Sequence, residues 1–528
     1  MAGPIPELEE RATACARRLA DADCVLLASH IDADGLTSAA IASQALERAG
    51  IPFETVFEKQ LDADAIAAIA ATEYDTVLFT DFGSGQLDEI TVHEDEGAFT
   101  PIIADHHQPA DSETHYHLNP LLFGIDGASE LSGAGASYVL ARALADVSEV
   151  QRRETAKRTT TTDGGASAAR ADNRDLAALA VVGAVGDMQA SGGELHGANE
   201  RIVAEGVEAG VIETSTDLAL YGKQTRPLPK LLEYATDVRI PGISGSERGA
   251  LSFLDDLDLE LKRTGGGDNT GTSTSTSTST SDGNWRRWAE LSGDEKQTVA
   301  SALVKRAVSR GVPASKIDQL VGTAYVLSEE PVGTELRDAS EFSTLLNATA
   351  RYDRADVGLG VCLGDRDEAL DRARTLLRDH RRNLSNGIEL VTEEGVTHAE
   401  HVQWFHAEDR IRETIVGIVA GMAMGNAGIS RSKPIIAFAD KRDEAGSDAP
   451  DKNDSEKHEQ TQDVKVSARA THSLTRQGLD LSAVMSQAAR AVGGDGGGHN
   501  VAAGATVPKG EERAFVDRAD ELVGDQLS

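Results

Sequence analysis

Acidic and histidine side chains directly follow an apolar run at four separated places in the sequence. The four groups are His30, Asp32 and Asp34; Asp81; Asp105, His106 and His107; and Asp187. Carboxylate oxygens mixed with imidazole nitrogens suit hard divalent cations such as Mn²⁺ and Mg²⁺ better than a structural zinc ion. One such aspartate would more often cap a helix or close a turn, but four groups in the same setting indicate one shared metal site.

The apolar runs that precede these groups predict buried strands at residues 24–29, 76–80, 102–104 and 180–186. Ala-rich helical pieces separate the runs, such as a helix over 36–49 that ends at Gly50. This alternation predicts an α/β fold with a mostly parallel sheet and right-handed crossovers. Because ligands bind beyond the carboxyl ends of the strands in such a sheet, the four groups would meet there.

A cleft that holds so many carboxylates needs cations to offset their mutual repulsion. Two divalent metal ions, about 3.5–4 Å apart, would neutralise the cluster and hold a phosphoryl group for in-line displacement. The residue types therefore predict a two-metal enzyme that acts on phosphate esters.

The motifs also resemble a known family. The order His30-x-Asp32-x-Asp34-Gly35, Asp81, Asp105-His106-His107 and Asp187 resembles the four motifs of the DHH phosphoesterase superfamily. Residues 493–499, with sequence GGDGGGH, resemble the glycine-rich motif of its DHHA1 companion domain. The combination is similar to the RecJ branch, and residues 335–342 and 364–365 resemble archaeal RecJ-like nucleases, including the GINS-associated nuclease.

The resemblance implies an architecture and an activity. The fold would be α/β, with a parallel-sheet DHH domain, a smaller α/β DHHA1 domain and the active cleft between them. The activity would be single-strand-specific exonuclease cleavage in the 5′ to 3′ direction, on DNA with RNA as a further substrate, in replication or repair. The partners would be single-stranded nucleic acid and replisome proteins such as GINS.

The resemblance further implies which residues hold the two cations, Mn²⁺ or Mg²⁺. One ion would be held by His30, Asp32 and Asp81, and the other by Asp34, Asp81, His106 and Asp187, so that Asp81 bridges. His107 would face the scissile phosphate, while Asp105 would orient an imidazole.

Substrate-binding residues are expected in both domains. Gly496, Gly497 and Gly498 can adopt positive φ and expose consecutive N–H groups as an anion-binding nest beside His499, and the resemblance places Arg469 toward nucleic acid. Ser132 and Gly133 lie at the predicted start of a helix. They would either present N–H groups to a phosphate or serve only close helix packing, and the sequence supports both interpretations equally.

The resemblance, together with shifts in composition, implies that the chain has three parts. Residues 1–235 would form the DHH catalytic domain, with a polar insert at 149–173. Residues 236–333 would form a connector or insertion, whose Ser/Thr-rich stretch 265–283 cannot bury a core and is expected to be a disordered loop. Residues 334–528 would form the DHHA1 domain, with a strand at 359–363 and an acidic loop at 440–462.

The charge balance bears on both partner and compartment. With 87 acidic and 51 basic residues the formal net charge is −36, which opposes non-specific binding of nucleic acid. A salt-rich cytoplasm would screen this repulsion, and the low lysine count of 14 fits a halophilic surface. Three widely spaced cysteines indicate a reducing compartment. Without a signal peptide or a long apolar stretch, the protein is expected to be cytoplasmic and not membrane-bound.

Two other functions fit the same motifs. Some DHH phosphoesterases act on short oligonucleotides or nucleotides, and the additional domains favour a longer polymer without excluding these substrates. The replicative-helicase cofactor related to RecJ keeps the fold but has lost metal ligands. Every ligand position is filled here, which argues against a catalytically silent protein.

Overall fold

The computed structural model describes residues 3–158, 172–190, 192–235, 238–263, 284–441 and 463–527. The Ser/Thr-rich stretch 265–283, residues 159–171 of the polar insert and residues 442–462 of the acidic loop lie outside the described residues. The chain divides into two compact units, residues 1–374 and 375–528. The sequence-based boundary at 333/334 therefore falls inside the first unit.

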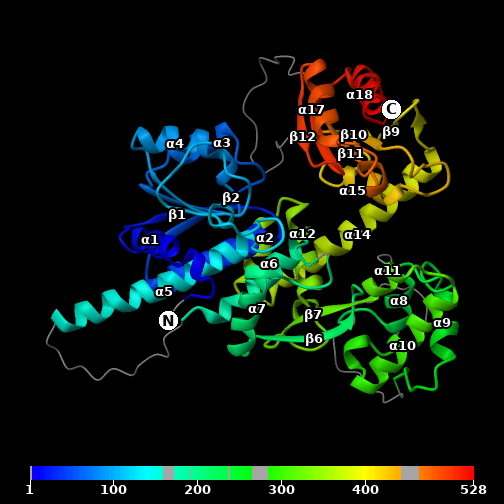
Figure 1. Cartoon of the computed structure of the whole chain (residues 1–528), viewed down its shortest axis with the longest axis horizontal. Coiled ribbons are helices and arrows are strands. Elements are labelled where there is room, and N and C mark those ends of the chain that lie inside the picture. Colours follow the sequence, from blue (N-terminus) through cyan, green and yellow to red (C-terminus); the bar gives the residue numbers. More distant parts are fainter. Residues whose placement is uncertain are drawn as a thin grey trace. The chain divides into compact units, whose positions relative to one another are not determined.

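The first unit is built on a five-stranded, wholly parallel sheet with the strand order β2-β1-β3-β4-β5. Figure 1 shows its strands, which are β1 (Val25–His30), β2 (Phe53–Glu58), β3 (Thr76–Thr80), β4 (Thr100–Ala104) and β5 (His117–Leu118). All five residues of β3 are buried. The parallel α/β fold is therefore confirmed.

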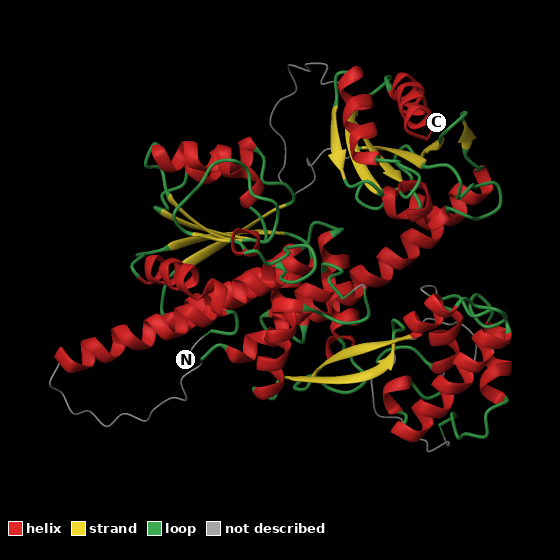
Figure 2. Ribbon diagram, in the orientation of Figure 1, coloured by secondary structure: helices red, strands yellow, loops and turns green. Residues whose placement is uncertain are grey.

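Helices cover both faces of this sheet (Figure 2). They are α1 (Glu9–Ala20), α2 (Ala33–Ala49), α3 (Ala63–Ala70), α4 (Leu87–Asp95) and α5 (Gly133–Arg158). Helix α6 (Ala177–Gly186) packs against α2 and α5, and α7 (Gly197–Glu208) packs against α6. Asp32 caps the start of α2, and Gly50, with φ of 77°, ends it in the left-handed conformation that glycine favours.

Two expectations about secondary structure are wrong. The apolar run before Asp187 forms helix α6 instead of a strand, because Gly183 lets this helix pack tightly. A Cβ at Gly183 would lie 2.4 Å from an Asp34 carboxylate oxygen. The stretch 359–363 belongs mostly to helix α13 (Ala355–Cys362), in which Gly358 makes a similar close approach to Leu36. The polar insert begins as a continuation of α5, which reaches Arg158.

An antiparallel pair of strands joins the middle region to the rest of the first unit. Strand β6 (Ile212–Leu218) pairs with β7 (Val321–Leu327) along its whole length. Between them lie α8 (Leu228–Glu233), α9 (Glu247–Asp255), α10 (Gly293–Ser309) and α11 (Ala314–Ile317). These helices share a core that includes Trp288, Leu231 and Leu303. After β7, α12 (Ala339–Ala350) packs against α6 and α2.

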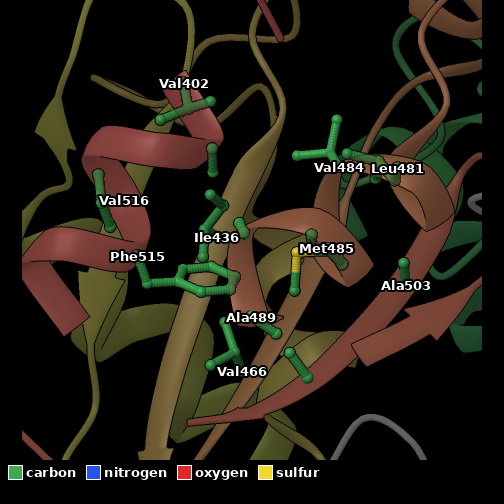
Figure 3. Close-up of a cluster of buried hydrophobic side chains, with 14 of the residues drawn as sticks. Val402, Ile436, Val466, Leu481, Val484, Met485, Ala489, Ala503, Phe515 and Val516 are labelled. Carbon is green, nitrogen blue, oxygen red and sulfur yellow. The ribbon is translucent and has the colours of Figure 1, made fainter. Parts of the chain in front are cut away.

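The second unit contains a six-stranded mixed sheet with the order β12-β13-β11-β10-β9-β8. The boundary falls within α14 (Glu368–Glu394), and the other elements are β8 (Thr397–His398), β9 (Gln403–His406), α15 (Val416–Ala423), β10 (Ile435–Asp440), β11 (Asp463–Arg469), α16 (His472–Thr475), α17 (Leu481–Ala491), β12 (Asp495–Gly498), β13 (Ala502–Pro508) and α18 (Glu512–Leu527). In its core, Phe515 of α18 and Met485 of α17 pack with Val466 and Ile436 of the sheet (Figure 3).

None of the helices in the described ranges is long and apolar enough to cross a membrane. Cys15, Cys24 and Cys362 are free thiols.

Candidate metal centre

The predicted metal ligands gather at the carboxyl ends of neighbouring strands in the parallel sheet. Strand β1 ends in His30, Asp81 directly follows β3, and His106 follows β4 by two residues. These three strands are neighbours and run parallel, so their carboxyl ends lie side by side. The remaining carboxylates come from helix ends, since Asp32 and Asp34 lie at the start of α2 and Asp187 at the end of α6.

The ligand atoms form two groups. His30, Asp32 and Asp81 place one ligand atom each within 4.8 Å of one another, and Asp34, His106 and Asp187 do the same. In the first group, His30 Nδ1 lies 3.3 Å from Asp32 Oδ1 and 3.5 Å from Asp81 Oδ2. This group is partly open to solvent, since Asp32 is 45% exposed, whereas Asp34 in the second group is 2% exposed.

Asp81 connects the two groups. Its Oδ2 faces His30, while its Oδ1 lies 3.3 Å from His106 Nε2. Oδ1 is buried and has no hydrogen-bond partner among the described residues. The residue adopts a φ of 62°, an unfavourable conformation for aspartate that aims the carboxylate into the site. A buried, unpartnered carboxylate oxygen between imidazoles and carboxylates fits a pair of divalent cations.

The electrostatics of the site show the same need for positive charge. Burial and the charges of Asp81 and Asp187 raise the pKa of Asp34 well above its usual range. Burial also raises the pKa of Asp187, to about 6. Burial alone would lower the pKa of His30, but its bonds to Asp32 and Asp81 raise it to about 11. Bound protons would thus reduce the excess negative charge wherever cations do not.

The start of α5 holds Asp34 in place. The N–H groups of Gly133 and Ala134 donate to the two oxygens of Asp34, at 2.7 and 3.0 Å. A Cβ at Gly133 would lie 2.4 Å from Asp81 Oδ1, so only glycine fits there. Ser132 is fully buried and accepts the N–H of Gly135. The Gly133 N–H is therefore taken by Asp34, a predicted metal ligand, while the Ser132 side chain bonds within the start of α5.

Gly127 and Gln189 organise the second group, and no motif in the sequence predicted either residue. The carbonyl of Gly127 accepts hydrogen bonds from His106 Nδ1 at 2.7 Å and from the Gln189 amide at 2.9 Å. The bond to Nδ1 leaves Nε2 of the neutral imidazole free to bind a cation. The same Gln189 amide donates to Asp187 Oδ2 at 2.9 Å. No spacing in the sequence marks Gln189, because its role depends on the turn that follows α6.

Asp105 and His107 form a hydrogen-bonded pair beside these two groups. Asp105 is fully buried and accepts hydrogen bonds from His107 Nδ1 at 2.8 Å, from the His106 and His107 N–H groups, and from the Ser84 N–H. His107 is 56% exposed, so its Nε2 edge is accessible. Asn119, also missed from the sequence, donates to the His107 carbonyl and to the Ser84 hydroxyl.

A pocket of about 220 Å³ opens beside this pair. Metal-centre residues line one part of the pocket, and polar, apolar and charged residues line the remainder, the full set being His30, Asp81, Asp105, His107, Lys59, Gln60, Leu61, Phe82, Gly85 and Gln86. A group that enters the pocket would therefore reach both the cation ligands and His107.

The substrate-binding residues expected in the second unit lie on its sheet. Gly496, Gly497 and Gly498 form edge strand β12 instead of a nest, and only Gly498 of the three has a positive φ. His499 is exposed in the turn that leads to β13. Arg469 ends β11 beside Gly417, where a Cβ would lie 2.5 Å from its guanidinium.

Three domain families match the chain in sequence order. The DHH family N-terminal domain matches residues 24–162, the DHH-CID domain matches 220–269 and 273–321, and the DHHA1 domain matches 401–525. An uncharacterised protein of Methanocaldococcus jannaschii is 28% identical over 507 residues, which cover 94% of this chain and 93% of that protein.

Solved structures share the fold at low sequence identity. CDC45 from Entamoeba histolytica has a TM-score of 0.58 at 12% identity, with 98% of each chain covered. RecJ from Thermus thermophilus in complex with Mn²⁺ has a TM-score of 0.54 at 16% identity, and the match covers 99% of this chain but 56% of that one. Exonuclease RecJ bound to manganese has a TM-score of 0.53 at 15% identity, covering 98% of this chain and 94% of that one. With its DHH, DHH-CID and DHHA1 domains in that order, the chain belongs to the DHH/DHHA1 superfamily, and its fold is similar to that of RecJ.

Proposed function

We propose that this protein is a metal-dependent exonuclease that hydrolyses single-stranded nucleic acid with two divalent cations, Mn²⁺ or Mg²⁺. The observation that carries the proposal is the placement of Asp81, which turns one carboxylate oxygen toward each ligand group. The expected substrate is single-stranded DNA, degraded from the 5′ end, with RNA as a second substrate.

The chain's own residues would divide the work as follows. His30, Asp32 and Asp81 would hold one cation, and Asp34, Asp81, His106 and Asp187 the other; when bound, the cations offset the charge of the phosphodiester and activate it toward hydrolysis. His107 would contact an oxygen of the scissile phosphate through Nε2. Asp105 would keep the ring in that orientation through its bond to Nδ1.

A polymeric substrate is supported by the second unit. An edge strand leaves one row of backbone N–H groups without strand partners, and β12 carries no side chains at Gly496, Gly497 and Gly498 that would keep a phosphate backbone away. Arg469 and His499 would add contacts to phosphates. The net charge of −36 makes such contacts depend on salt. A cytoplasmic role in replication or repair, with replisome proteins such as GINS as partners, is part of the proposal.

The test is time-resolved cleavage of single-stranded DNA and RNA oligonucleotides, labelled at either end, with Mn²⁺ in molar KCl. Mononucleotides that appear from the 5′ end, and disappear in Asp81→Ala, are the expected result. Release from the 3′ end would reverse the proposed direction.

A catalytically silent replication factor is the second candidate, because the fold also matches CDC45 along nearly the whole chain. Binding of single strands without cleavage, at any salt or metal concentration, would favour it. Cleavage of di- or trinucleotides alone would instead indicate a phosphoesterase for short substrates.

A further inference from the structure

Helix α12 brings the side chain of Asn347 to the metal centre from a distant part of the sequence. Asn347 Oδ1 accepts the backbone N–H of Ala33 at 3.1 Å. Ala33 is 1% exposed and lies between the ligands Asp32 and Asp34. The two bonded residues are 314 positions apart in the chain.

The bond completes the hydrogen bonding at the start of α2. The first N–H groups of a helix have no partner within the helix. Asp32 Oδ1 accepts two of them, from Asp34 at 3.1 Å and from Gly35 at 3.0 Å. The Ala33 N–H is taken by Asn347 instead. Without this acceptor, a buried donor between two metal ligands would be left unpaired, which disfavours the observed backbone conformation.

Helix α12 is itself well anchored for this task. At its start, the buried carboxylate of Glu341 accepts the N–H of Gln224 at 2.7 Å, and Asp338 lies 3.4 Å from Lys223 Nζ. Farther along, Ser343 lies against Gly186, where a Cβ would be 3.2 Å from the serine Cβ. Gly186 directly precedes Asp187. Helix α12 therefore contacts α2 and α6, the two helices whose ends hold predicted ligands of both groups.

We propose that Asn347 is a positioning residue for the metal centre, which fixes the backbone between Asp32 and Asp34 so that both carboxylates are oriented before cations bind. This inference rests on the proposed two-cation site. Loss of such outer partners costs about 10–100-fold in metal affinity. The positioning role of Asn347 depends on its hydrogen-bond acceptor. The carboxamide of asparagine and the carboxylate of aspartate both supply an acceptor, whereas the alkyl side chain of leucine, which is of the same size, does not.

The experiment is a titration of the full chain with Mn²⁺ alone, followed by electron paramagnetic resonance of the free ion, for the parent, Asn347→Leu and Asn347→Asp. We expect at least about tenfold weaker binding for Asn347→Leu and binding within about threefold of the parent for Asn347→Asp. Thr344→Ala is the matched control, because the Thr344 hydroxyl bonds only within α12, to the Ser340 carbonyl. Cleavage at saturating Mn²⁺ should be restored in Asn347→Leu.

A second measurement tests the same role in case Asn347→Leu folds poorly. Hydrogen exchange of the Ala33 amide in metal-free Asn347→Ala should be faster than in the parent, while exchange in β3 stays unchanged. Equal Mn²⁺ affinity in the parent and Asn347→Leu, or equal losses in Asn347→Leu and Asn347→Asp, would overturn the positioning role. Absence of Mn²⁺ binding by the parent would instead overturn the metal centre, and this inference with it.

Discussion

In the first unit, ionisable side chains make up the candidate metal centre, and some of them are held by several hydrogen bonds. Asp34 receives two backbone N–H groups, and Asp105 receives four hydrogen bonds. The candidate substrate-binding strand β12 of the second unit has the opposite construction. It consists of Asp495 and three glycines, and offers backbone in place of side chains. The metal centre should therefore be sensitive to changes in charge, and the strand to added volume.

The largest effect is expected from Asp81→Asn, which keeps the shape of the bridging side chain and removes its charge. We expect cleavage to fall by more than about 100-fold, beyond the usual cost of losing an outer partner, and the second Mn²⁺ to bind weakly. The metal-free protein should unfold at a lower temperature, because His30 and His106, which against the effect of burial hold the pKa of Asp81 below its usual range, lose their charged partner. Retained cleavage at ordinary Mn²⁺ concentrations would show that Asp81 does not bridge.

Gly133→Ala tests whether added volume can also damage the metal centre. The new Cβ would press on Asp81 Oδ1, 2.4 Å away, so we expect about 10–100-fold weaker Mn²⁺ binding and a loss of about 1–3 kcal/mol in the free energy of unfolding. Gly293→Ala is the control, since nothing lies within 4 Å of a Cβ there. If both variants bind Mn²⁺ as the parent does, the close approach of α5 to Asp81 is not needed for metal binding.

Two neighbouring glycines of β12 separate packing from substrate contact. A Cβ at Gly496 would lie 2.9 Å from the Met485 carbonyl, whereas nothing lies within 4 Å of one at Gly497. Gly496→Ala should therefore destabilise the second unit by about 1–3 kcal/mol. Gly497→Ala should leave the unfolding transition unchanged and raise the KM for single strands several-fold. An unchanged KM in Gly497→Ala would remove β12 from the proposed substrate path.

The last prediction concerns Glu341, a buried carboxylate outside the metal centre. Burial raises its pKa from 4.5 to about 7, so its contribution to stability is complete below about pH 4.5 and is lost as the pH rises to 7. The change is at most about 3 kcal/mol. In Glu341→Gln, denaturant titrations at pH 5 and pH 8 should differ less than in the parent. The same difference in both proteins would show that Glu341 is already charged at pH 5.

The sequence was sufficient for the elements whose patterns are local. Apolar runs that end in acidic or histidine residues predicted β1, β3 and β4. They also predicted that His30, Asp81 and His106 meet at the carboxyl ends of these strands. The run before Asp187 failed because a helix buried on all sides has no apolar period to distinguish it from a buried strand. Gln189, Asn119 and Asn347 carry no local signal, since each acts on backbone or side chains that only the folded chain brings near.

Because β6 and β7 form an antiparallel pair, the segment between them could be replaced by another one. Leu218 and Val321 are direct cross-strand partners, so a short hairpin turn could join the two strands and replace the helices between them. Such a shortened chain would lose the partners of Glu341 at Gln224 and Thr225, and an apolar residue in place of Glu341 would avoid an unpaired buried charge. Another domain could be inserted between Leu218 and Val321 without changing the register in which β6 and β7 pair.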